Sequence, residues 1–94
     1  MQFTTLLSIT TSEREALVAK SIVSREQEIL AYEVNISVYE RAAVTATGEY
    51  LAQLTELIAA ETRERDKCLV LRNALMQEIP QHKLSSAIVA ATKG

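Results

Sequence analysis

The stretch TATGEY, residues 45–50, decides the fold of this chain of 94 residues. Gly48 is one of only two glycines, and neither Gly nor Pro occurs in residues 12–47. Glycine readily takes the left-handed backbone conformation that closes a helix, and Thr47 is of a residue type that caps the helix after it. The stretch therefore predicts a turn between two long helices.

The residues before this turn predict a helix over 12–46. Ser12 and Glu15 have the spacing of a capping box, in which each side chain accepts a hydrogen bond from the other residue's amide. Apolar residues then recur at alternating steps of four and three, the heptad spacing of a helix that packs along a neighbour. The segment 33–39, EVNISVY, alternates like a strand, but it has no convincing partner strand, so we expect it to be helical. The apolar row consists of Val18, Ile22, Ile29, Tyr32, Ile36, Tyr39, Ala43 and Ala46, and only Arg25 interrupts it.

The residues after the turn predict a second helix over 49–79, which Pro80 ends. Matched helices around one glycine favour an antiparallel hairpin, and the alternative is one continuous helix over 12–79. Residues 81–92 are expected to form a short helix or a tail, and residues 1–11 an N-terminal arm. The second helix's row comprises Leu51, Leu54, Ile58, Cys68, Leu75 and Ile79, with the charged residues Glu61, Arg65 and Arg72 in the same row.

The first helix carries a second apolar row, roughly 150° from the first by the 100° helical step. A helix in an isolated hairpin has one neighbour and needs one apolar stripe, so two stripes require two neighbours. A second copy of the chain supplies the other neighbour most simply, in a homodimer or higher oligomer built as a four-helix bundle or coiled-coil-like assembly. The alternative is that the chain termini fold back over this row. Its members are Ala16, Ala19, Val23, Leu30 and Val34, and we expect Val23, Leu30 and Val34 to form the interface.

The charges beside the first row offer a way to set the register of the hairpin. Glu26 and Glu33 are seven residues apart, and an antiparallel turn near Gly48 places Glu33 near Arg65 and Glu26 near Arg72. We hypothesise that these two pairs form, within one chain or with its dimer mate, and fix register at some cost in stability. The alternative is a solvated segment with local pairs, each contributing about 0.2–0.5 kcal/mol. Those local pairs are Glu61–Arg65, Arg63–Asp66 and Glu64–Lys67.

Composition disfavours most other functions. The net charge of −2 has no basic block, whereas nucleic-acid binding is driven largely by Lys and Arg on phosphates. The single cysteine, Cys68, excludes an intrachain disulfide and a metal site built from cysteines of one chain. No phosphate-binding glycine loop or nucleophile elbow occurs, so we expect neither a cofactor nor catalysis. No stretch has the roughly 20 apolar residues of a membrane span, and we expect a cytoplasmic protein.

We therefore expect an all-α helical hairpin with a short C-terminal helix, in one domain that self-associates. Its expected role is non-enzymatic protein–protein contact, with itself and with another protein, as an adaptor, assembly chaperone, inhibitor or small structural subunit. A second possibility is a regulator of nucleic-acid machinery, or a weak nucleic-acid binder through Arg63, Arg65, Lys67 and Arg72. A third is a metal-carboxylate bundle using Glu33, Glu40 and Glu61, which is the least favoured because the chain has one histidine and no Glu-x-x-His motif.

Overall fold

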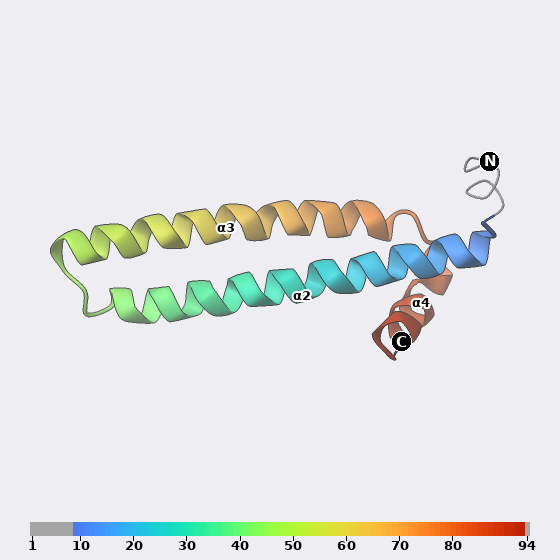
Figure 1. Ribbon diagram of the computed structural model, residues 1–94, viewed down its shortest axis with the longest axis horizontal. Coiled ribbons are helices and arrows are strands. Elements are labelled where there is room, and N and C mark those ends of the chain that lie inside the picture. Colours follow the sequence, from blue (N-terminus) through green and yellow to red (C-terminus); the bar gives the residue numbers. More distant parts are fainter. Residues whose placement is uncertain (1–8, 94) are drawn as a thin grey trace. The chain divides into compact units, whose positions relative to one another are not determined.

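The computed structural model describes residues 9–93 and is all-α, as predicted (Figure 1). Helix α2 spans Thr11–Ala43, α3 spans Gly48–Met76 and α4 spans Gln81–Lys93, and no strand occurs within this range. Most of the predicted arm over 1–11 lies outside the described residues. None of the helices in the described part of the chain combines the length and the apolar character needed to cross a membrane.

The chain divides into two compact units, and both include part of α2. The hairpin unit is Arg25–Leu71, and the terminal unit comprises the described residues up to Ser24 together with those from Arg72 onward. Each unit has its own set of buried residues, so each is described separately below.

The hairpin unit confirms a turn next to Gly48. Helix α2 ends at Ala43, three residues before the predicted end at 46, and Gly48 begins α3 instead of closing the first helix. Residues 44–47 separate α2 from α3, and Gly48 has a φ of +61° at the first position of α3. The carbonyl of Thr47 accepts a hydrogen bond from the amide of Leu51 at 3.4 Å, so Thr47 precedes the first turn of α3 as expected of a cap. The alternative of one continuous helix over 12–79 is therefore wrong.

The capping box lies two residues earlier than predicted. The Thr10 hydroxyl accepts a hydrogen bond from the Glu13 amide at 3.1 Å, and the Glu13 carboxylate accepts one from the Thr10 amide at 3.3 Å. Ser12 and Glu15 have the same spacing, but Glu15 instead pairs with Lys83 of α4 at 3.5 Å. The prediction at Ser12 was wrong because two overlapping stretches satisfy one motif, and a contact with a distant helix engages the carboxylate of the second.

Helix α3 ends at Met76, three residues before the predicted end. The amides of Gln77 and Glu78 donate to the carbonyls three residues earlier, at 3.2 and 3.0 Å, which tightens the last turn. Ile79 precedes Pro80, and a residue before proline disfavours the helical conformation. Ile79 leaves the helix and is only 3% exposed, so its side chain belongs to the core of the terminal unit.

The seam of the hairpin unit follows the predicted heptad rows, except that Leu51, a predicted member of the row of α3, is 37% exposed. Ile29 and Ile36 of α2 are buried, as are Leu54 and Cys68 of α3, and segment 33–39 is helical throughout. In Figure 1 these stretches of α2 and α3 run side by side from the turn. The buried side chains of α2 and of α3 lie along one face of each helix, so in this unit each helix has one apolar neighbour.

The terminal unit has a three-helix core. Ala19 and Ile22 of α2 are fully buried against Ile79 and Leu84. Helix α4 therefore covers part of the second apolar row of α2, which is the fold-back alternative realised for the Ala19 end of that row. Six further residues are partly buried against this core: Val18, Leu75, Met76, Ala87, Ile88 and Ala91.

Candidate interaction surface

The second apolar row of α2 is exposed in the hairpin unit. Leu30 is 62% exposed, Val34 is 53% exposed and Val38 is 52% exposed. These residues follow one another at intervals of four, so they form a single ridge on the helix surface. Val38 extends the predicted interface, and the same four-residue step could have identified it from the sequence. We call Leu30, Val34 and Val38 the α2 ridge.

The difference between the two ends of the second row follows from the number of helices around α2. In the terminal unit α4 packs on α2 and Ala19 has no exposed surface. The hairpin unit supplies only α3 as a neighbour. By the 100° step, Val34 lies about 140–160° around the helix from Ile29 and Ile36, so it faces away from α3. Within the hairpin unit, no other helix covers the ridge.

Two charged residues lie at opposite ends of the α2 ridge. Glu26 is four residues before Leu30 and continues the ridge, while Arg41 is three residues after Val38. Both are exposed, and neither forms a salt bridge with any other residue in 9–93. Val23, the remaining predicted interface residue of this row, is half-buried.

The charged side chains in the middle of α3 pair mainly with residues nearby on the same helix. Arg65 pairs with Asp66 at 3.1 Å, and Lys67 pairs with Glu64 at 3.3 Å. Within the chain, Arg65 therefore does not pair with Glu33, which is exposed, and the intrachain form of that hypothesis was wrong. Side chains close together on one helix can form such pairs without any alignment between α2 and α3.

The other hypothesised pair stays a prediction. Glu26 belongs to the hairpin unit and Arg72 to the terminal unit. The Arg72 guanidinium donates to the Asn73 side-chain oxygen through Nε at 3.3 Å and through Nη2 at 3.1 Å. Pairing of Glu33 or Glu26 with an arginine of a second chain likewise remains a prediction.

Polar side chains cross the seam of the hairpin unit at two places. Asn35 Nδ2 donates to Glu61 Oε1 at 3.4 Å, which gives the charge on the apolar row of α3 a partner from α2. The Cys68 thiol lies 3.6 Å from Glu28 Oε2, and Arg25 pairs with the other oxygen of Glu28 at 3.0 Å. Arg25, which interrupts the row of α2, thus neutralises a carboxylate on its own helix.

The environment of Cys68 disfavours its thiolate. Burial raises the pKa of the Cys68 thiol, and the negative charge of Glu28 and its hydrogen bond raise that pKa further, whereas Arg25 lowers it. A reactive cysteine needs the opposite, a lowered pKa in a cationic and accessible site. Cys68 is 6% exposed and packs as a small apolar residue.

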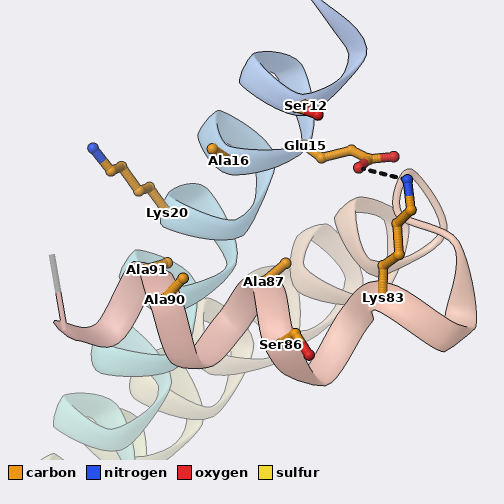
Figure 2. A pocket seen from close by; sticks show the side chains of 9 residues that line it. All are labelled: Ser12, Glu15, Ala16, Lys20, Lys83, Ser86, Ala87, Ala90 and Ala91. Atoms are coloured by element: carbon orange, nitrogen blue, oxygen red, sulfur yellow. Dashed lines mark hydrogen bonds and ion pairs between the residues drawn. The ribbon is translucent and has the colours of Figure 1, made fainter.

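The terminal unit has a shallow groove between α2 and α4, of about 430 Å³ (Figure 2). Small side chains form most of its surface, and the Glu15–Lys83 pair lies at one end, as Figure 2 shows, with Lys20 at the other. The lining residues of the groove are Ser12, Glu15, Ala16, Lys20, Lys83, Ser86, Ala87, Ala90 and Ala91.

In the part of the chain that the structure describes, no group of three or more His, Cys, Asp or Glu side chains is placed to hold a metal ion. The chain matches no protein-family model, no curated protein and no solved structure.

Proposed function

We propose that this protein is a non-enzymatic protein–protein interaction module that self-associates through the α2 ridge. The observation that carries the proposal is the exposure of Leu30, Val34 and Val38, each by more than half, on a single face of one helix. Fully burying a Val or Leu side chain contributes roughly 1.5–3 kcal/mol. Packing a second helix on this face therefore gains a large free energy from the burial of these apolar side chains.

The terminal unit supports this proposal because α2 there packs against a second helix, α4. Where α4 packs against it, Ala19 and Ile22 lose all their exposed surface. The α2 ridge requires an equivalent neighbour, and a second copy of the chain brings the same ridge in return. Such self-matching surfaces are the basis of two-fold symmetric dimers.

In the proposed assembly the two α2 helices lie together at the centre, because the α2 ridge faces away from α3. Each α3 then lies on the outer side of its own α2. The assembly contains four long helices in layers, a variant of the predicted bundle. Its role is structural contact, as an adaptor, assembly chaperone, inhibitor or small subunit in the cytoplasm, with binding of another protein on the surfaces that the dimer leaves exposed.

The test is the mass of the protein in solution over a range of concentrations, measured by sedimentation velocity and light scattering. We expect a concentration-dependent dimer for the wild-type chain. The double variant Leu30→Gln/Val34→Gln should remain monomeric, with an unchanged helical circular dichroism spectrum because both side chains are exposed in the single chain.

The matched control is Val70→Gln, which changes an apolar side chain 68% exposed on α3. It should dimerise like the wild type. A wild-type chain that stays monomeric at its highest attainable concentration would overturn the proposal. Dimerisation that Val70→Gln abolishes and Leu30→Gln/Val34→Gln preserves would move the interface to α3.

A further inference from the structure

We infer that the α2 ridge pairs with the same ridge of a second copy in an antiparallel arrangement centred on Val34, with Glu26 of each copy opposite Arg41 of the other. This inference rests on the proposed self-association and adds the partner's orientation and the residues that select it. It starts from the spacing of the ridge and from the charges at its two ends.

The spacing of four residues defines how two such helices fit together. Ridges formed at steps of four pack into the grooves beside the equivalent ridges of another helix, the commonest class of helix packing. Glu26, Leu30, Val34 and Val38 make one such ridge. Ser37 and Arg41 belong to the neighbouring ridge, so Arg41 lines the groove that the partner's ridge enters.

In the antiparallel arrangement, the apolar positions of the ridge face apolar positions of the partner, and the charge at each end lies near an opposite charge. With Val34 on the two-fold axis, each Leu30 faces the partner's Val38, so the three central positions of the ridge all face apolar side chains. Glu26 then faces the position of residue 42, next to Arg41. Two opposite-charge pairs result, one at each end of the contact.

The parallel arrangement fails at both ends. There each residue faces its own copy, so Glu26 would lie against a second Glu26 and Arg41 against a second Arg41. Like charges across an interface disfavour that arrangement and so select against wrong partners. The exposed, unpaired state of both residues within the described part of one chain leaves them free for the antiparallel contact.

The experiment is a charge-reversal series measured as the dimer dissociation constant at low salt. Glu26→Arg and Arg41→Glu should each weaken the dimer about tenfold, because each replaces two attractive pairs by two repulsive ones. The double variant E26R/R41E should return the constant to the wild-type value, because both pairs are restored with their signs exchanged. The control Glu56→Arg makes the same change of net charge as Glu26→Arg, at an exposed position of α3, and should have no such effect.

The outcomes separate this inference from the proposed function. Single variants that dimerise like the wild type would overturn the antiparallel register, because a parallel pair keeps the same number of like-charge contacts when one sign is reversed. A double variant as weak as the single variants would also overturn it. A wild-type chain that does not dimerise at all would instead remove the proposed function on which the register depends.

Discussion

The thiol of Cys68 on α3 lies 3.6 Å from the carboxylate of Glu28 on α2 and donates a hydrogen bond to it. The contact crosses the seam of the hairpin unit over a separation of 40 residues in the chain. It joins an otherwise apolar side chain to the only Glu28 oxygen that Arg25 does not engage.

The first prediction concerns the chemical reactivity of Cys68. A neutral thiol reagent should modify it far more slowly than free cysteine, because burial and Glu28 raise its pKa and the thiolate is the reacting form. Glu28→Gln should speed the reaction by removing the negative charge and leaving Arg25, which lowers the pKa. Glu33→Gln makes the same change at an exposed position of α2, and an equal acceleration by that variant would contradict the role of Glu28.

The second prediction concerns stability at alkaline pH. Because the pKa of Cys68 is raised in the folded chain, the unfolded chain releases the thiol proton first. The stability that the raised thiol pKa contributes is fully present below the pKa of the unfolded thiol, about 8.5. It is lost as the pH rises through the pKa of the folded thiol. The free energy of unfolding, measured by denaturant titration, should therefore fall as the pH rises above about 8.5.

The variant Cys68→Ser should remove the early part of this alkaline loss. A further loss should remain above about pH 10, since burial first, and then the charges of nearby glutamates, still raise the pKa of the Tyr32 hydroxyl when Cys68 is absent. Identical pH curves for the variant and the wild type would show that Cys68 does not titrate differently in the folded and unfolded chains.

The third prediction distinguishes the two overlapping capping boxes. Thr10→Ala should lower the free energy of unfolding by about 1 kcal/mol, because it leaves the Glu13 amide without its side-chain acceptor. Ser12→Ala should have little effect, since α2 already begins one residue before it. Thermal denaturation of both variants makes the comparison, and a larger loss for Ser12→Ala would place the cap at the later motif.

The fourth prediction concerns the turn of the hairpin unit. Gly48→Ala should cost about 1–2 kcal/mol, because an L residue at a φ of +61° is strained. Apart from the local backbone, no atom lies within 4 Å of an added Cβ, so the cost comes from the backbone conformation at Gly48 and not from a clash with a more distant part of the chain. Gly48→Asn should cost less, because asparagine tolerates the left-handed region better than alanine. Equal losses for the two variants would contradict this cause.

The fifth prediction tests the packing of α4. Leu84→Ala should lower the free energy of unfolding by about 2–5 kcal/mol, the usual range for removing a large buried side chain, because Leu84 is 7% exposed and belongs to the core with Ile22 and Ile79. Val89→Ala changes an apolar residue 52% exposed on the same helix and should have a small effect. Chemical denaturation of both variants gives the comparison, and equal effects would mean that α4 does not pack through Leu84.

The sequence by itself determined the elements that depend on neighbouring residues along the chain. The heptad row from Val18 to Ala43 predicted one buried face of α2, and Gly48 predicted the turn, because helical periodicity and a left-handed glycine are local properties. Ala46, the last predicted member of the row, lies beyond the end of α2. Pro80 predicted the end of α3 to within three residues. It could not show that Ile79 would leave the helix to enter the terminal core.

Only the tertiary structure decided which residues far apart in the sequence meet. The spacing of the second row treats Ala19 and Leu30 alike, yet Ala19 is buried in the terminal unit, where α4 packs on α2, and Leu30 is 62% exposed in the hairpin unit. The capping motifs at Thr10 and Ser12 are equivalent in sequence, and the contact of Glu15 with Lys83 separates them. The physical reason is that burial and ion pairing depend on where a distant helix packs, and periodicity along one helix carries no information about that position.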